Sequence, residues 1–219
     1  MKNTIKKASL VVVAVITLSV FSTSLVLAQS SDFYEKLKFG VKGGLNVTSM
    51  NDEDRVPDAK VTPRIGFHLG VLAHYDWNDK WAIQPEVVYS KEGAKYDFPG
   101  SPEIPFEYRG KTDINLINIP ILVQYKIGSQ FRIQTGPQTG LIINANFEDA
   151  NDKNNESRKL DIQRVNLTWA IGFGYLTKSG LGFDARYNVG ITNIYPDEVY
   201  PGQSLRTRAG QFGIFYQFK

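Results

Sequence analysis

Apolar residues occupy every second position in eight segments of this chain, and polar residues or glycines stand between them. In the last segment, Phe212, Ile214 and Tyr216 alternate with Gln211 and Gly213. Successive side chains of a β-strand point to opposite faces, so this period of two predicts strands with one apolar face. The predicted strands cover residues 37–48, 63–76, 80–91, 112–127, 130–146, 163–177, 180–192 and 206–218. The pattern predicts an all-β protein, because no helical period competes with it after the first 28 residues.

The connections between these strands alternate in length. Short ones lie at 77–80, 128–129 and 178–180, and long ones lie near 49–62, 92–111, 147–162 and 193–205. Each predicted strand is longer than the roughly 9–11 residues that a tilted membrane strand needs. Short periplasmic turns and long outer loops are typical of bacterial outer-membrane barrels. We therefore expect an eight-stranded antiparallel up-and-down transmembrane β-barrel with four long outer loops.

Alternation alone does not show which face of a barrel is inside, so a soluble lipocalin-like barrel with an apolar lumen is the alternative. Eight strands enclose only enough room for filling side chains or one small ligand. An inverted barrel would have to place large side chains such as Phe67, Trp169 and Phe212 in that lumen. The opposite face carries glycines and polar residues, which suit a crowded interior. The limited volume therefore favours a membrane barrel with its apolar face outward.

Three prolines lie inside predicted strands, at Pro85, Pro120 and Pro137. Proline cannot donate to the ladder of hydrogen bonds, and a closed barrel has no edge strand on which to place it. We therefore expect bulges in these strands and at least one strand break near Pro120.

The first 28 residues have the features of a secretory signal peptide. Three lysines precede an apolar run over residues 10–21, and small side chains lead up to Ala28. We expect cleavage after Ala28, which leaves residues 29–219 as one barrel domain. A retained anchor helix is the alternative, but spanning needs about 20 mostly apolar residues, and polar residues interrupt this stretch.

Charge and cysteine content exclude several classes of partner and site. The chain has 25 Lys and Arg residues against 22 Asp and Glu, and the three lysines of the leader account for the whole excess. The mature chain is therefore near neutral, which gives no reason to expect a nucleic-acid partner. With no cysteine, there is no disulfide, no thiolate metal site and no lipid-anchored N-terminus.

Charged residues fall on the polar face of the predicted barrel, where they need partners away from bulk water. The candidates for an interior network are Lys42, Arg64, His68, Glu86, Lys126, Arg132, Asp184 and Arg186. We expect their salt bridges and hydrogen bonds to fill the narrow barrel. The alternative is a narrow channel that prefers anions, because basic residues outnumber acidic ones in this group.

No spacing in the chain singles out a catalytic or metal site. His68 and His74 share a face, but six residues at about 3.3 Å each place them roughly 20 Å apart, too far for one metal ion. Glu86 with His68 is the least implausible acid-base pair, and a structural ion pair is the simpler interpretation of Glu86. We expect a protein that is not an enzyme and that has no metal or other cofactor.

The second and fourth long connections are rich in aromatic residues. The candidates for a contact surface are Tyr96, Phe98, Phe106, Tyr108, Tyr195 and Tyr200. Binding residues concentrate on loops that a rigid scaffold carries, and aromatic residues are typical of protein contacts. Aromatic packing at the membrane surface is the alternative.

Four stretches of the chain resemble the outer-membrane β-barrel domain family of PorT type. They are residues 42–46 (KGGLN), 85–94 (PEVVYSKEGA), 118–126 (NIPILVQYK) and 136–140 (GPQTG). The resemblance implies a small barrel in the outer membrane of a Gram-negative bacterium and, for PorT itself, a role in protein secretion across that membrane. We expect a structural or interaction protein in contact with outer-membrane lipid and with envelope or secretion proteins. An accessory role in secretion is the second interpretation, and a narrow channel is the third.

Overall fold

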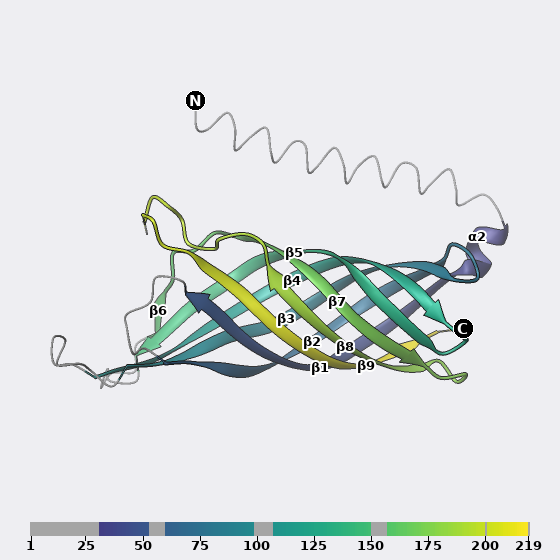
Figure 1. Cartoon of the computed structure of the whole chain (residues 1–219), viewed down its shortest axis with the longest axis horizontal. Helices are drawn as coiled ribbons and strands as arrows, with labels where there is room; N and C mark the ends of the chain where they lie inside the picture. The colour runs from purple at the N-terminus through teal and green to yellow at the C-terminus, as the bar shows by residue number, and fades with distance from the viewer. Residues whose placement is uncertain (1–30, 53–59, 99–106, 150–156, 200, 219) are drawn as a thin grey trace, which may run out of the picture.

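The computed structural model describes residues 31–52, 60–98, 107–149, 157–199 and 201–218, and Figure 1 shows their arrangement. The elements are α2 (Ser31–Lys36), β1 (Leu37–Asp52), β2 (Lys60–Asp76), β3 (Trp81–Phe98), β4 (Tyr108–Ile127), β5 (Phe131–Asp149), β6 (Ser157–Lys159), β7 (Val165–Leu176), β8 (Leu181–Gly190) and β9 (Leu205–Gln217). The leader predicted at residues 1–28 lies outside the described residues. In the described part of the chain, no helix is long and apolar enough to cross a membrane.

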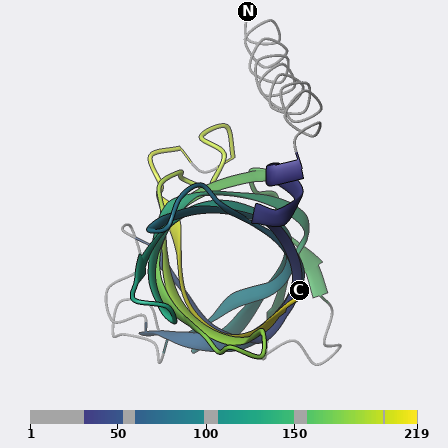
Figure 2. The ribbon, with the colours of Figure 1, turned by 90° about the vertical axis from the view of Figure 1, so that its right-hand side faces the viewer.

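Eight of the described strands close into a ring, which Figure 2 shows from one end. Around the ring, the order is β1, β2, β3, β4, β5, β7, β8 and β9, and β9 pairs with β1 to complete it. Every one of these neighbouring pairs is antiparallel. The predicted eight-stranded antiparallel barrel is therefore confirmed. The short strand β6 was not predicted, and it pairs with β5 beyond the point where β7 begins.

The barrel has two different ends. At the turn end, on the right in Figure 1, short connections join β2 to β3, β4 to β5 and β7 to β8, and the helix α2 lies there. The opposite end, the loop end, carries the long connections. This alternation of short and long connections is the one that the sequence predicts, and it is typical of outer-membrane barrels.

The strands β3 and β4 continue well into the region that the sequence pattern predicts as the second outer loop. They stay paired as far as Phe98 opposite Tyr108, so the loop prediction is wrong for Tyr96, Phe98 and Tyr108. The period of two persists here, but the alternate residues Lys95 and Asp97 are charged. Strand pairing does not require an apolar outer face, so the barrel wall extends beyond its apolar part.

Below the loop end, the barrel wall is apolar outside, and most of the side chains that face inward are polar. Adjacent residues of β2 illustrate this, because Leu69 is 64% exposed and His68 is 2% exposed. Other exposed apolar side chains are Phe39, Leu45, Ile65, Phe67, Val71, Ile121, Ile133, Ile171, Phe173, Phe183, Phe212 and Ile214. A wall of this kind fits the hydrocarbon of a bilayer, where such a large exposed apolar surface is stable.

Aromatic side chains gather near the turn end of the wall. The rings of Trp81 and Tyr125 lie 4.9 Å apart, and those of Phe131 and Tyr175 lie 5.1 Å apart. Trp81 and Phe131 are the first residues of β3 and β5, next to the short turns. Aromatic residues at this height are typical of the girdles that border the apolar band of outer-membrane barrels.

Pro120 does not break β4, so the prediction of a strand break there is wrong. Pro120 pairs with Gln138 of β5, and the register is the same on both sides of it. Proline removes one donor from the ladder, but its fixed φ of about −65° lies within the extended range, so the strand keeps its direction. Register shifts occur instead between Pro63 and His68, and between Asn115 and Leu116.

Candidate functional site

Four buried charges meet in the middle of the barrel. The ammonium of Lys42 lies 2.8 Å from a carboxylate oxygen of Asp184 and 3.4 Å from one of Glu86. The guanidinium of Arg186 donates to both oxygens of Glu86, at 2.8 and 2.5 Å, and lies 2.7 Å from Asp184. The four side chains are between 0 and 5% exposed. We call this group the ion quartet.

The ion quartet spans the whole width of the barrel. Lys42 belongs to β1, Glu86 to β3, and Asp184 and Arg186 to β8. In the ring order, β3 and β8 lie four strands apart and are therefore on opposite walls. Two cations face two carboxylates, so the group has no net charge, and each ion lies within ion-pair distance of an opposite charge. The quartet therefore joins opposite walls and fills the interior between them.

A layer of mostly neutral side chains lies next to the quartet. His68 Nδ1 is 2.8 Å from Asn46 Oδ1, and the amide of Asn46 donates to Ser90 Oγ at 2.7 Å. Ser90 Oγ in turn donates to Glu92 at 2.9 Å, and the Asn118 amide donates to the same carboxylate oxygen at 3.2 Å. The imidazole of His68 is thus bonded to an amide and not to Glu86, so the hypothetical acid-base pair of His68 and Glu86 is not formed.

Two further predicted interior residues lie toward the turn end. Arg132 donates to Gln124 at 3.2 Å, and its guanidinium carbon lies 5.8 Å from the centre of the Phe215 ring. Lys126 is partly exposed and lies 2.9 Å from Asp76, a residue that also contacts His74 at 3.0 Å. The histidines His68 and His74 therefore have separate partners. Among the described residues, no three His, Asp or Glu side chains are grouped as a metal site.

Arg64 differs from the expectation, because it does not belong to the interior network. It forms an ion pair with Asp113, which also lies 3.4 Å from Lys91. Asp113 stands between the interior residues Thr112 and Ile114, so alternation places its side chain on the outer side of the wall. The register between β2 and β3 shifts by one residue between Pro63 and His68, so the alternation of inward and outward side chains in β2 is interrupted near Arg64. Such a bulge cannot be recognised from alternation alone.

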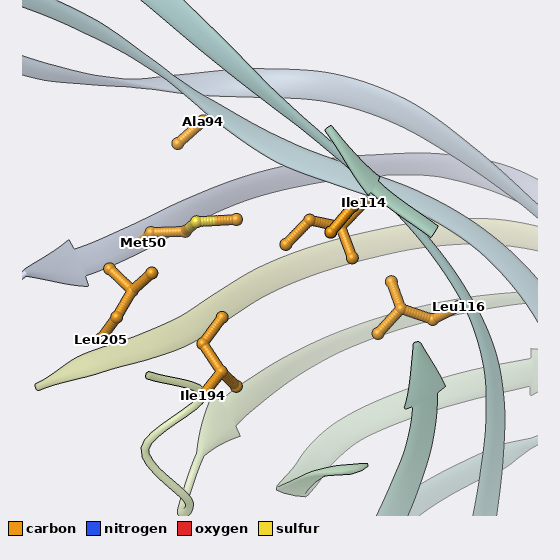
Figure 3. Packing of buried hydrophobic residues seen from close by; sticks show 7 residues of the cluster. Met50, Ala94, Ile114, Leu116, Ile194 and Leu205 are labelled. Atoms are coloured by element: carbon orange, nitrogen blue, oxygen red, sulfur yellow. The ribbon is translucent and has the colours of Figure 1, made fainter. Parts of the chain in front are cut away.

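The interior of the loop end is apolar, which the sequence prediction missed. Seven buried residues form a cluster there: Met50, Ala94, Ile114, Leu116, Ala145, Ile194 and Leu205. Figure 3 labels all of them except Ala145. A signal for it was present, because Ile114 and Leu116 share the face of β4 that carries Asn118 and Gln124. Toward the loop end, the inward face of β4 thus carries two large apolar side chains next to each other, Ile114 and Leu116.

A β-bulge in β5 completes this cluster. Leu116 pairs with Ile142, whereas Asn115 pairs with Asn144, so Ile143 is an extra residue. Beyond the bulge, Ala145 and not Asn144 pairs with the interior residue Ile114. Because the extra residue reverses the alternation, apolar side chains of β5 stay inside at the loop end.

Two of the aromatic contact candidates lie against this cluster. Tyr96 and Tyr195 pack against it, and the hydroxyl of Tyr96 donates to the sulfur of Met50 at 3.4 Å. Phe98 and Tyr108 are paired at the tips of β3 and β4. Phe106 and Tyr200 lie outside the described residues. At least two of the candidates, Tyr96 and Tyr195, therefore help to form the interior of the loop end.

A pocket of about 430 Å³ opens beside the cluster. Its apolar lining includes Met50, Tyr96, Ile114, Phe147, Leu160 and Ile162. Arg158 and Lys159 of β6 add two basic residues, and no acidic residue is among the described residues that line the pocket. We call this space the mouth pocket.

Comparison with known proteins agrees with this architecture. The model of the family described as outer membrane protein beta-barrel domain matches residues 27–195. No curated protein matches the chain. The chain is similar to the solved structure of Ail, the attachment invasion locus protein of Yersinia pestis, with 14% identity, 83% of this chain and 98% of Ail covered, and a TM-score of 0.49.

Two further solved structures are similar to this chain. Neisserial surface protein A is 15% identical, with 82% of this chain and 97% of that protein covered and a TM-score of 0.49. OprG from Pseudomonas aeruginosa is 18% identical, with 83% and 95% covered and a TM-score of 0.45. The family match spans most of the barrel, and the barrel has the apolar outer wall of a membrane protein. The chain therefore belongs to the outer membrane protein β-barrel domain family.

Proposed function

We propose that this protein is a non-enzymatic outer-membrane barrel that acts by binding at its loop end. The ion quartet is the observation that carries the proposal. Its side chains join opposite walls and are at most 5% exposed, so the middle of the barrel is filled with paired charges. A filled interior argues against the narrow channel. It leaves the two ends as the places where a partner can bind.

The loop end is built to project from the membrane. Two ion pairs lie on the outer side of its wall. Lys111 is 2.7 Å from Glu148, and Arg109 is 3.4 Å from Asp97. These charges are incompatible with the hydrocarbon of the bilayer but stable in water. Because β3 and β4 remain paired at this height, the hydrogen-bonded sheet of the barrel continues into the loop end. A rigid scaffold of this kind suits a binding surface.

An accessory role in secretion, which the resemblance to PorT implies, is a more specific form of the same proposal. Its partner would be a subunit of a secretion machine, and the leader predicted at residues 1–28 would deliver the chain to the envelope. Identification of the bound partner tests this more specific form of the proposal.

The test is photocrosslinking in living cells with a photoreactive amino acid at one position at a time. Asp97 is an exposed loop-end position, and Lys178 is an exposed turn-end position that serves as the matched control. We expect a discrete crosslinked product from position 97 that position 178 does not give. Secretion-machine subunits in this product would support the accessory role. Equal products from both positions, or a product from position 178 only, would contradict a binding role of the loop end.

A further inference from the structure

We propose that the mouth pocket binds a small water-borne amphiphile that has an apolar chain and one anionic end. This inference deepens the proposed function, on which it rests, by naming the chemical class that the loop end would bind. A volume of about 430 Å³ lies within the range of roughly 300–1,000 Å³ that is usual for small-molecule sites. Side chains from β1, β3, β4, β5 and β6 contribute to its lining.

The lining suits an apolar chain. Ile114 and Leu205 are at most 3% exposed and form one side of the pocket, and the partly buried Leu160 and Ile162 pack against the same cluster. In Figure 3, the side chains of Met50, Ile114, Ile194 and Leu205 point toward one another across the interior. An apolar chain in this space would leave water and contact apolar atoms, which is the main favourable term in binding of this kind.

The pocket is closed toward the membrane side. Between the cluster and the layer of side chains that contains Ser90 and Glu92 lies a cavity of only about 10 Å³, with Met50 and Leu116 in its lining. A cavity needs roughly 10–15 Å³ to hold even one water molecule. An alkyl chain therefore cannot pass from the mouth pocket into the polar interior. The geometry supports binding at the mouth and not passage through the barrel.

The charges on the outer side of the wall favour a ligand from water over one from the bilayer. Phe147 lines the pocket and pairs with Thr112 of β4. The next pair in the register is Lys111 with Glu148, whose charges form an ion pair. Because neighbouring residues on a strand face opposite sides, the wall outside the pocket is charged. This height lies above the hydrocarbon, so the acyl chains of the surrounding bilayer are not the source of the ligand.

Arg158 provides the charge that would select an anion. It pairs with Phe147 across β5 and β6, and side chains directly opposite each other in an antiparallel pair lie on the same face. Phe147 faces the pocket, so Arg158 faces it too, and both residues line it. The guanidinium is suited to carboxylate because it can donate two parallel hydrogen bonds. With two basic residues and no acidic one in its described lining, the pocket favours an anionic end over a cationic one.

The test uses octanoate as the probe and octyltrimethylammonium as the probe of opposite charge. Titration calorimetry is done on the full-length mature protein in lipid nanodiscs, and the heat measured with empty nanodiscs is subtracted to remove partition into lipid. We expect saturable binding of one octanoate per protein. We also expect binding of octyltrimethylammonium to be at least tenfold weaker.

Three variants make the result specific. Arg158→Glu changes an exposed residue and should weaken octanoate at least tenfold while strengthening octyltrimethylammonium. Ile162→Trp fills the pocket and should abolish binding of both probes. Lys178→Glu makes the same charge change as Arg158→Glu, but at the turn end, and should leave both affinities unchanged.

Two results would overturn the inference. One is a heat no larger than that of empty nanodiscs, and the other is equal octanoate binding by the wild type and Arg158→Glu. Folding of each variant is checked by the heat-dependent gel shift, and Arg158→Glu keeps the test valid if Ile162→Trp does not fold. Absence of octanoate binding by the wild type, with a crosslink that is specific to position 97, would refute only this inference. Equal crosslinks from positions 97 and 178 would contradict the proposed function.

Discussion

Replacing Glu86 with glutamine should destabilise the barrel more than any comparable change of a surface acid. Glutamine has nearly the same shape, so the change removes charge and leaves volume almost constant. Glu86 accepts two hydrogen bonds from Arg186, one from Gln84 at 2.7 Å, and lies 3.4 Å from Lys42. In Glu86→Gln, the two cations would share Asp184, and the quartet would carry an uncompensated positive charge. Removal of one partner of a buried ion pair costs about 3–5 kcal/mol, so we expect a loss of this size.

The control for this experiment is Glu148→Gln, the same substitution in an ion pair that is 31–42% exposed. Exposed pairs contribute about 0–1 kcal/mol, so this variant should unfold almost like the wild type. The free energy of unfolding is measured by urea titration in lipid vesicles, with tryptophan fluorescence and the gel shift as readouts. A loss for Glu86→Gln no larger than that for Glu148→Gln would refute the reasoning.

A second charge removal separates charge balance from other effects of the substitution. Lys42→Met combined with Glu86→Gln leaves Arg186 with Asp184, which are 2.7 Å apart, and restores a net charge of zero. We expect the double variant to be less destabilised than the sum of the two single variants by about 0.5–3 kcal/mol, the usual range for contacting residues. Strict additivity would show that the four charges do not act as one group.

Three further predictions concern other parts of the barrel. Glu92→Gln should change the free energy of unfolding by less than about 1 kcal/mol, because Glu92 accepts from the neutral Ser90 and Asn118 and the retained amide oxygen can still accept from both. A loss as large as that of Glu86→Gln would show that the charge of Glu92 matters. Ile171→Arg, at an exposed apolar position in the middle of β7, should lower the free energy of unfolding in vesicles by about 2–4 kcal/mol, and Ile127→Arg at the turn end by about 0–1 kcal/mol. Equal losses would contradict a bilayer midplane near the middle of β7. Gly44→Ala should lower the free energy of unfolding in urea titration by about 1–3 kcal/mol, because the new methyl group would overlap the Phe212 carbonyl oxygen, whereas the methyl group of Gly43→Ala meets Leu69 at an ordinary 3.4 Å. Equal stability of the two variants would contradict the close packing of β1 against β9.

The architecture could be predicted because every membrane strand has to bury one face in lipid. Outward apolar residues stand at every second position of each strand, as Phe67 and Leu69 do in β2, so the strand number and the outward face follow from a period of two. The extent of β3 and β4 could not be predicted in the same way. Beyond Ala94, the outward residues contact water, so charged residues such as Lys95 and Asp97 can stand on the wall there. In the membrane-spanning part of the same strands, the outward residues are apolar.

The contacts inside the barrel depend on information that alternation does not contain. Glu86 and Arg186 are 100 residues apart in the chain, and they meet because the ring places β3 opposite β8. Alternation shows that both side chains face inward, but not at which height each one lies. Arg64 shows a second limit, because the register shift between Pro63 and His68 alters which side of the wall it faces. The mouth pocket depends on a third such feature, the extra residue Ile143 in β5.

Paired side chains close the interior of the barrel. Single-channel recording in a planar bilayer tests this closure most directly, with protein whose folding is established by the heat-dependent gel shift. We predict a flat trace at all voltages below those that break the bilayer, because the ion quartet joins opposite walls with side chains that are at most 5% exposed. Stepwise conductance that changes when Arg132 or Arg186 is replaced would contradict the claim and would restore the narrow channel as the function of the protein.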